Sequence, residues 1–360
     1  MQSKKLRKLK YAESIKEALF ASMKLNKKTI LVGLGVTDPK GVFGTTKNLL
    51  KHFGKKRVIE MPTSENAMTG IAIGAAIKGL RPIITHQRVE FALLSMDQII
   101  NQAAKWHFMT AGEQKIPLVI RLIIGKGWGQ GPQHSQSLEV LFAHIPGLKV
   151  VAPSNAYDAK GMMMQSIKDN NPVIFFEHRW LHEITGFVPK KNYTVSLNKA
   201  KIVKKGTHIT VVSYSEALIQ VMRTYDFLKS QNIFMDLIDL RSLRPLDTAT
   251  IIKSVKKTGK LLVIDNGWTT FGISAEIIST VTETVFRKLK KSPARIGIKN
   301  CPIPSSRELA KYCYLNSSTI IQKIEDMTEK KINKKNKNLF LKKVNQINSD
   351  IPYANFKGPF

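Results

Sequence analysis

Cysteine is almost absent from this sequence, and no long hydrophobic run occurs in it. The 360 residues include only two cysteines, Cys301 and Cys313, which are too few for a disulfide framework and fit no metal-ligand spacing. No apolar segment reaches the roughly eighteen residues that are needed to span a bilayer. The N-terminal sequence MQSKKLRKLK is basic and is not followed by the apolar core of a secretory signal. These absences predict a cytoplasmic protein without a membrane partner.

Acidic residues are scarce as well. The chain has 57 Lys and Arg against 26 Asp and Glu, which gives a net charge of +31 and a pI near 10.1. Such a charge raises the question of a nucleic-acid or anionic-surface partner. The lysines are scattered over turns, helix faces and the tail, without the aromatic interleaving of a single-strand binder or a Cys/His finger. We therefore interpret the charge as a compositional bias and expect no nucleic acid as a partner.

Apolar segments of two kinds alternate along the chain. With 43% hydrophobic residues, a chain of this length can bury the cores of two domains. Helical periodicity over 11–23 and 90–109 and buried-strand patterns over 29–34 and 116–124 predict a first α/β domain. A polar, lysine-rich stretch over 189–206 marks the boundary. The second half alternates strands with helices, which predicts two layered α/β domains with mostly parallel sheets. Its expected strands cover 208–213, 234–239, 260–265 and 294–298, and its expected helices cover 216–230, 248–258 and 274–289.

The segment from Met61 to Phe91 combines a loop, a crowded helix and an isolated carboxylate. A loop with Pro62 precedes an Ala- and Gly-rich helix that ends at Gly79. Small residues between Gly70 and Ala76 allow another backbone or a ligand to approach the helix closely. Glu65 lies in the first helical turn. Position alone allows the simple interpretation that this carboxylate complements the helix dipole.

A second unusual segment, GKGWGQGPQHSQ, covers residues 125–136. Its glycines predict a backbone wrapped closely against another group, but their spacing is neither that of a Walker loop nor that of a dinucleotide-binding loop. His134 lies in this segment. An imidazole is suited to proton transfer near neutral pH, although most loop histidines are only solvated.

These two segments resemble the beta subunit of thiamine-diphosphate-dependent 2-oxo acid dehydrogenases of the pyruvate and branched-chain type. The resemblance rests on Pro62, Glu65, the Gly79-Leu80-Arg81-Pro82 run and the Gln133-His134-Ser135 run, and it extends over about residues 10–327. It implies a transketolase-like pyrimidine-binding domain over 10–190 and a transketolase C-terminal-like domain over 205–327, which in the family chiefly supports assembly. Residues 328–360 are expected to form a basic, poorly ordered tail.

The resemblance also implies roles for individual residues. Glu65 and His134 match the catalytic glutamate and histidine of the family, and Glu65 would hydrogen-bond the aminopyrimidine ring of the cofactor. Phe91 matches an aromatic residue that packs on this ring, and Gln87 matches a glutamine on the cofactor side. Asp169 and Asn171 match an element that holds potassium in some members. A capped helix C-terminus is the equally simple interpretation of that element.

The family's Gly-Asp-Gly motif, which holds the diphosphate and Mg²⁺, is absent from the chain. In the family this motif is on the alpha subunit, so the resemblance implies half of a shared thiamine diphosphate site. It also implies an α₂β₂ heterotetramer that decarboxylates a 2-oxo acid, with pyruvate as the expected substrate. The acyl group would pass to the lipoyl groups of an acyltransferase.

The sequence departs from the family at two places. Residues 33–36, Gly-Leu-Gly-Val, lack an acidic pair that the family usually carries there, and residues 85–90 differ from the apolar run of many members. Two other interpretations stay open. One is the C-terminal half of a split transketolase, which has the same two-domain order. The other is a catalytically degenerate scaffold or basic binding protein, which these departures and the charge of +31 favour.

Overall fold

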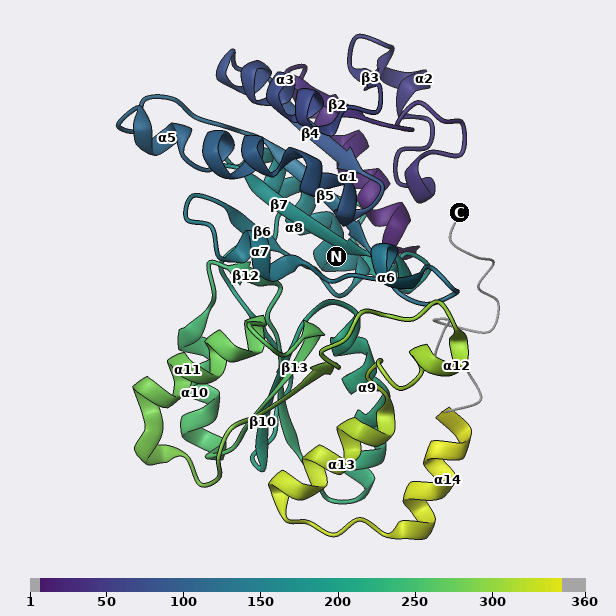
Figure 1. The fold of residues 1–360 in the computed structure, drawn as a ribbon, viewed down its shortest axis with the longest axis vertical. Coiled ribbons are helices and arrows are strands. Elements are labelled where there is room, and N and C mark those ends of the chain that lie inside the picture. The colour runs from purple at the N-terminus through teal and green to yellow at the C-terminus, as the bar shows by residue number, and fades with distance from the viewer. Residues whose placement is uncertain (1–6, 345–360) are drawn as a thin grey trace, which may run out of the picture. The chain divides into compact units, whose positions relative to one another are not determined.

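The computed structural model describes residues 7–344, which fold into two α/β units. Within these residues, the first unit comprises 7–125 together with Leu141–Leu197 and Ser242–Pro245. The second comprises Lys126–Val140, Asn198–Arg241 and 246–344. Both units have mostly parallel sheets with helices on each face, as the alternating pattern predicts (Figure 1).

A seven-stranded sheet forms the centre of the first unit, in the order β12-β6-β7-β5-β4-β2-β3. Every neighbouring pair is parallel except β12 with β6. The central strands are short runs of β-branched and apolar residues that are buried along their whole length, as expected for strands covered on both faces. Strands β1 and β8 form a separate antiparallel pair. The strands of this unit are β1 (Arg7–Lys10), β2 (Thr29–Gly33), β3 (Val58–Glu60), β4 (Arg81–His86), β5 (Val119–Ile124), β6 (Lys149–Val151), β7 (Val173–His178), β8 (Thr185–Val188) and β12 (Ser242–Arg244).

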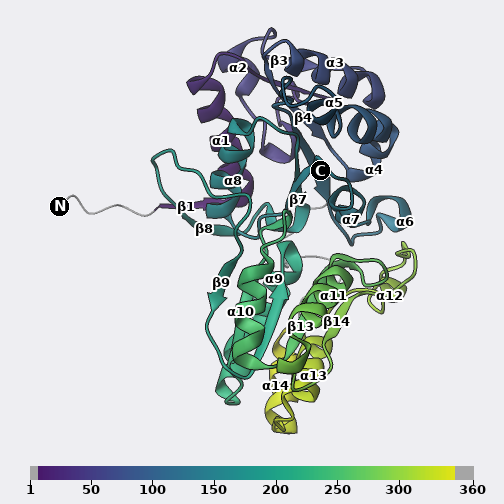
Figure 2. The ribbon, with the colours of Figure 1, turned by 90° about the vertical axis from the view of Figure 1, so that its left-hand side faces the viewer.

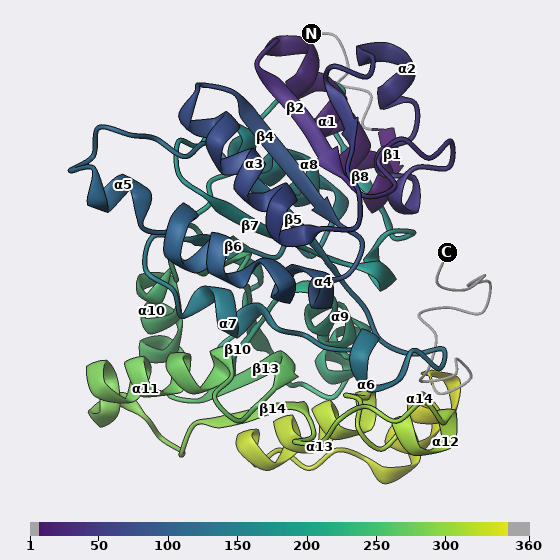
Figure 3. The same ribbon diagram turned by 45° about the horizontal axis from the view of Figure 1, so that its top comes forward.

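Two layers of helices cover this sheet. Helices α1 (Tyr11–Leu25) and α8 (Ala156–Lys168) pack together on one face, and α3 (Glu65–Ile77) and α4 (Val89–Ala92) lie on the other (Figures 2 and 3). The continuous helix predicted over 90–109 is wrong in detail. After α4 the chain passes through a 3₁₀ turn, a π-helical segment over Gln98–Ala103 and the short α5 (Trp106–Met109). The shorter helices are α2 (Leu49–Phe53), α6 (Gly131–His134) and α7 (Glu139–Ala143).

The second unit has a five-stranded sheet in the order β14-β13-β10-β11-β9, in which only β9 is antiparallel. Figure 1 shows α10 and α11 on one face and α9 and α13 on the other. None of the helices between residues 7 and 344 is both long and apolar enough to cross a membrane. The elements are β9 (Lys201–Lys204), β10 (Ile209–Ser213), α9 (Ser215–Ser230), β11 (Met235–Asp239), α10 (Thr248–Thr258), β13 (Leu261–Trp268), α11 (Ile273–Val285), β14 (Ala294–Ile298), α12 (Arg307–Ala310), α13 (Ser317–Thr328) and α14 (Lys334–Val344).

The beginning of the tail is ordered, in contrast to the prediction of a poorly ordered segment over 328–360. Residues 334–344 form α14, and Phe340 stacks on Phe227 of α9 with ring centroids 4.4 Å apart. Lys337 forms an ion pair with Glu325 at 2.9 Å. Two apolar side chains in this lysine-rich segment, Phe340 and Leu341, pack against the core of the second unit. The remaining part of the predicted tail, 345–360, lies outside the described residues.

Candidate active site

The carboxyl ends of β3, β2, β4, β5 and β7 lie at one edge of the first sheet, because these neighbouring strands are all parallel. Ligands of open α/β sheets bind at this edge. Glu65 follows β3 as the first residue of α3, and Gln87 directly follows β4. Phe91 lies in α4, the next helix. The topology therefore brings three of the predicted site residues to the same edge.

Glu65 is half-buried at the start of α3, where the positive end of the helix dipole favours a carboxylate. Its backbone carbonyl accepts a hydrogen bond from Thr69 Oγ1 at 2.8 Å. The small residues of α3 predict that another group approaches this helix closely. At Gly74 the described chain supplies no such group, because an added Cβ atom would meet nothing within 4 Å. Ile71 beside it is 59% exposed. This side of α3 is therefore open to a ligand or a second chain.

Gln87 holds the loop that follows β2. Its Nε2 atom donates to the carbonyl oxygen of Leu34 at 3.1 Å. Gly35 has a φ of +73°, a conformation that favours glycine, and a Cβ atom there would lie 2.5 Å from the same Nε2 atom and displace it. Gln87 thus has a loop-positioning contact, in addition to the cofactor contact that the resemblance implies.

Glu60 is a site residue that the sequence analysis missed. Its carboxylate accepts hydrogen bonds from the backbone N–H groups of Gly35 and Thr37 and from Thr37 Oγ1, the last at 2.7 Å. These bonds fix the loop that lacks the family's acidic pair. The only available signal was the position of Glu60 at the end of a short strand, paired with Gly33 of β2.

Behind the edge, an ion pair connects two central strands. Arg121 on β5 binds both carboxylate oxygens of Glu177 on β7, at 2.6 and 3.0 Å, and both side chains are fully buried. Burial raises the pKa of Glu177, but the Arg121 charge and a hydrogen bond from His182 outweigh it and lower the pKa to about 2. Arg121 also donates to Thr85 and Thr45. This network connects the strands that carry the site.

His86, at the end of β4, is almost completely buried. Burial alone lowers the pKa of its imidazole to about 4, so this ring is neutral at physiological pH. A neutral, enclosed histidine agrees with a structural role for this residue.

His134 is in the second unit, whereas Glu65, Gln87 and Phe91 are in the first. It lies within 10–190, the range expected for the pyrimidine-binding domain, and the contacts of the segment Lys126–Val140 group it with the second unit. Lys126 pairs with Glu216 of α9 at 2.7 Å, and the Gly127 N–H donates to the Tyr314 hydroxyl at 2.9 Å.

Further along the same loop, Glu139 and Ser137 accept hydrogen bonds from the side-chain amide of Asn266 on β13, at 3.0 and 3.2 Å. Burial raises the pKa of Glu139 to about 7. A cavity of about 30 Å³ adjoins this carboxyl group, lined also by Tyr214 and Asp265, whose side chains are hydrogen-bonded at 2.8 Å. The loop with His134 is thus held at both ends by side chains of the second unit.

The surroundings of Asp169 do not fit the potassium ion expected from the sequence. One carboxylate oxygen pairs with the Lys149 ammonium, and the other accepts from the backbone N–H and the side-chain amide of Asn171 at 3.0 and 3.2 Å. Arg81 donates to the backbone carbonyls of Ile167 and Asp169 at the end of α8. Between residues 7 and 344 there is no group of three or more His, Cys, Asp or Glu side chains that could hold a metal. A capped helix C-terminus accounts for this element.

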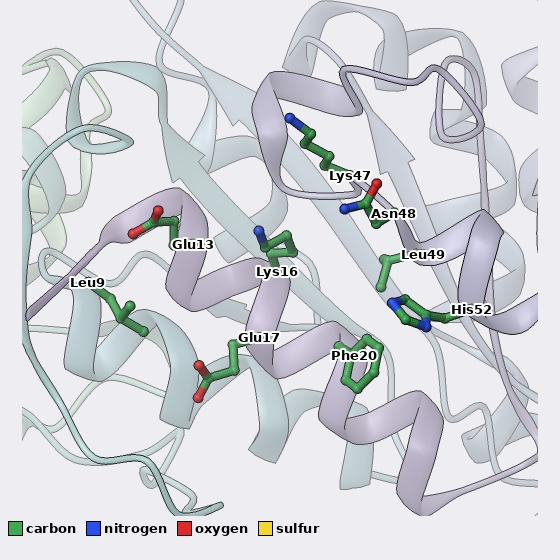
Figure 4. Close-up of a pocket in the computed structure, with 9 residues that line it drawn as sticks. All are labelled: Leu9, Glu13, Lys16, Glu17, Phe20, Lys47, Asn48, Leu49 and His52. Carbon is green, nitrogen blue, oxygen red and sulfur yellow. The ribbon is translucent and has the colours of Figure 1, made fainter. Parts of the chain in front are cut away.

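The first unit also has a hollow away from the sheet edge, with a volume of about 330 Å³. In Figure 4, Phe20 of α1 lies beside His52, and the two rings meet edge to face at 5.0 Å. Glu17, on its wall, is already paired with Arg7 and Lys160. This mixture of paired charges and apolar side chains offers no catalytic arrangement, and none of the predicted site residues lines it.

Comparison with known proteins defines the class of protein to which this chain belongs. The model "Transketolase, pyrimidine binding domain" matches residues 7–183, and the model "Transketolase, C-terminal domain" matches residues 198–320. A solved structure titled "Split gene transketolase, inactive beta4 tetramer" superposes with a TM-score of 0.73, covering 89% of this chain and 99% of that one. At 16% identity this likeness shows the fold alone.

Comparison with individual relatives narrows this class of protein to one family. The pyruvate dehydrogenase E1 component subunit beta of Rickettsia conorii is 37% identical over 313 residues, which cover 87% of this chain and 96% of that protein. The subunit of Porphyra purpurea is 36% identical, covering 88% and 95%, and the mitochondrial subunit of Mus musculus is 36% identical, covering 82% and 84%. The chain therefore belongs to the family of beta subunits of thiamine-diphosphate-dependent 2-oxo acid dehydrogenases. The family and the fold class that the sequence predicted are confirmed.

Proposed function

We propose that this chain supplies the beta-subunit half of an active site that oxidatively decarboxylates a 2-oxo acid. In this proposal the acyl group passes to the lipoyl groups of an acyltransferase, and pyruvate is the first acid to test because the relatives' names contain it. The observation that supports the proposal most is the convergence of Glu65, Gln87 and Phe91 at one sheet edge, in a chain of this family.

The residues at this edge fit the aminopyrimidine end of thiamine diphosphate. A half-buried carboxylate at a helix start, an amide and a half-buried aromatic ring are groups that can hold a polar heteroaromatic ring. When bound, thiamine diphosphate supplies an acidic carbon that can add to the carbonyl of a 2-oxo acid. Glu65 would share a proton with a ring nitrogen, and Phe91 would pack on the ring face. Gln87 would fix the neighbouring loop through Leu34.

His134 would hold or move a proton at the substrate. A half-buried imidazole in a loop fixed by Lys126, Gly127 and Glu139 is positioned more firmly than a solvated one. A role of His134 in proton transfer would account for the buried polar side chains of the second unit that fix this loop.

The diphosphate and Mg²⁺ would be held by an alpha subunit in an α₂β₂ assembly. The absence of a Gly-Asp-Gly motif from the sequence supports this division. Exposed apolar side chains on the helices at the site support it as well, because a partner would cover them. Ile71 of α3 is 59% exposed, and Leu93 and Leu94 after α4 are 39% and 66% exposed.

The test is 2-oxo acid-dependent reduction of an artificial electron acceptor by this chain co-purified with its alpha subunit. Pyruvate and branched-chain acids are compared in the presence of thiamine diphosphate and Mg²⁺. The proposal predicts turnover that disappears when either subunit or the cofactor is omitted. A stable complex with no turnover on any 2-oxo acid would contradict it.

A further inference from the structure

The two cysteines of the chain meet in the second unit. Cys301 follows β14 and Cys313 follows α12. They are 12 positions apart in the sequence, and their Sγ atoms lie 3.5 Å apart. The backbones of the two segments are adjacent as well, because the Lys299 N–H donates to the carbonyl oxygen of Cys313 at 3.2 Å. Two cysteines are too few for a disulfide framework, but this placement allows a single disulfide.

Both cysteines pack in a small apolar cluster with Ile298, Ile303 and Tyr314. Cys313 is only 6% exposed, whereas Cys301 is partly exposed. Burial, together with a hydrogen bond to Cys301, raises the pKa of the Cys313 thiol. Cys301 is therefore the thiol that an oxidant reaches first. In the part of the chain that the structure describes, no group of three or more His, Cys, Asp or Glu side chains could hold a metal, so the pair does not belong to a metal site.

The segment that contains the cysteines contacts the loop with His134. The hydroxyl of Tyr314, the residue after the second cysteine, accepts a hydrogen bond from the Gly127 N–H at 2.9 Å. Gly131 has a φ of +67°, and a Cβ atom there would lie 2.5 Å from Oγ of Ser305, which lies between the two cysteines. The loop with His134 therefore touches this segment at two places.

Formation of a disulfide would move this segment. The sulfur atoms of a disulfide are about 2.05 Å apart, so the two thiols would have to approach each other by about 1.5 Å. Tyr314 directly follows Cys313 in the chain. A shift of this size at the cysteine therefore changes the distance between the Tyr314 hydroxyl and the Gly127 N–H.

We propose that Cys301 and Cys313 are a modification site at which a peroxide forms a disulfide, and that this bond displaces the loop with His134 and lowers turnover. The effect on turnover rests on the proposed function, in which His134 holds or moves a proton at the substrate. The disulfide itself does not depend on that function.

Hydrogen peroxide is the oxidant in this reaction. Cys301 loses its proton, and its sulfur attacks one oxygen of the peroxide. The O–O bond breaks, a sulfenic acid forms on Cys301, and the departing hydroxide takes up the thiol proton as water. The Cys313 sulfur then attacks the sulfenic sulfur, so that the S–S bond forms and the S–O bond breaks. The second hydroxide leaves with the Cys313 proton as water. Two thiols are oxidised, and one peroxide is reduced to two waters.

The experiment treats the complex with its alpha subunit with a small excess of hydrogen peroxide and blocks the remaining thiols with iodoacetamide. Trypsin cleaves after Lys and Arg, so the disulfide would join the peptides 300–307 and 312–323. We expect mass spectrometry to detect this joined peptide, and dithiothreitol to remove it. Cysteines that are both alkylated, or oxidised separately, would overturn the disulfide and leave packing as the role of the two thiols.

Turnover of the same samples tests the displacement of the loop. Oxidation should lower kcat of the wild type by about 10-fold, because a misplaced proton-transfer group reacts more slowly, and dithiothreitol should restore it. The matched control Cys301→Ser/Cys313→Ser cannot form the bond and should show no loss that dithiothreitol reverses. If this variant does not assemble, Cys301→Ser replaces it. Equal reversible losses in wild type and control, or a disulfide without loss of kcat, would overturn the effect on the loop.

Absence of turnover with every 2-oxo acid in the reduced complex would contradict the proposed function, but the joined peptide is detected without turnover. Tryptophan fluorescence then tests the loop separately, because Trp128 lies within it. Oxidation should change the emission of the wild-type complex more than that of Trp128→Phe. Equal changes in both proteins would overturn the displacement of the loop.

Discussion

The two units use buried charge for different purposes. In the first, the Arg121–Glu177 pair lies inside the sheet and connects β5 with β7. In the second, the Lys126–Glu216 pair connects a glycine-rich loop to α9. Both pairs are buried, so removing one partner leaves the charge of the other partner buried. The first pair stabilises the framework under the site, whereas the second positions one segment. Mutations in the two units should therefore separate loss of stability from loss of turnover.

The largest effect is expected in the first unit. Arg121→Met leaves Glu177 charged, buried and without its guanidinium partner, which should lower the free energy of unfolding by about 3–5 kcal/mol. Urea denaturation of the purified chain measures the change. The double variant Arg121→Met/Glu177→Leu should recover much of the loss, because it removes both charges. A loss below about 1 kcal/mol in the single variant would show that the pair is not a framework element.

In the second unit, the double variant Lys126→Met/Glu216→Gln should lower kcat more than it lowers stability, because it breaks the contact without leaving a carboxylate buried opposite a neutral side chain. It frees the start of the loop with His134, and a misplaced proton-transfer group costs about 10- to 100-fold in rate. Turnover of the assembled complex and its thiamine diphosphate affinity are measured together, with Lys253→Met on the exposed face of α10 as the control. A parallel fall in turnover and cofactor affinity would contradict a role limited to the loop.

The Glu139 carboxyl group should make the stability of the chain depend on pH. Its pKa is raised in the folded chain to about 7 from an ordinary value of 4.5, so the folded state holds the proton longer than the unfolded state. Stability should therefore fall between about pH 4.5 and 7, by up to about 3 kcal/mol, and level off above that range. Glu139→Gln should flatten this part of the profile. An identical pH profile of stability in the variant would show that Glu139 does not cause this dependence.

The smallest effect concerns α14. Phe340→Ala removes the stacked contact with Phe227 and should lower the free energy of unfolding by about 1 kcal/mol, without changing turnover. Leu339→Ala is the control, because that side chain on the same helix is 70% exposed. Equal, negligible effects of both substitutions would show that α14 adds nothing to the core of the second unit.

Local patterns were sufficient to predict most of the fold. Buried runs such as β5 and β10 and amphipathic stretches such as α1 and α9 can be recognised without knowing their neighbours. The pattern over 90–109 was misleading because spacing near 3.6 residues does not distinguish a continuous helix from one broken by a π-helical segment. The lysines of α14 obscured the two apolar residues that dock it.

The site was predicted only where a motif exists. Glu65, Gln87 and Phe91 were found by resemblance, and the parallel topology brings them to one edge. Glu60 was missed, because its importance depends on Gly35 and Thr37, which are distant from it in the sequence. The assignment of the His134 loop to the second unit likewise depends on contacts more than 80 residues apart along the chain, such as Lys126 with Glu216 at a separation of 90.

The most direct test of the account is the substitution Glu65→Gln, measured in the complex with the alpha subunit. The variant keeps the size of the side chain but cannot share a proton as a carboxyl group can. We expect normal assembly and a loss of turnover of about 100-fold or more. The exposed control Glu113→Gln should behave like the wild type. Full activity of Glu65→Gln in an assembled complex would contradict the central role assigned to this carboxylate.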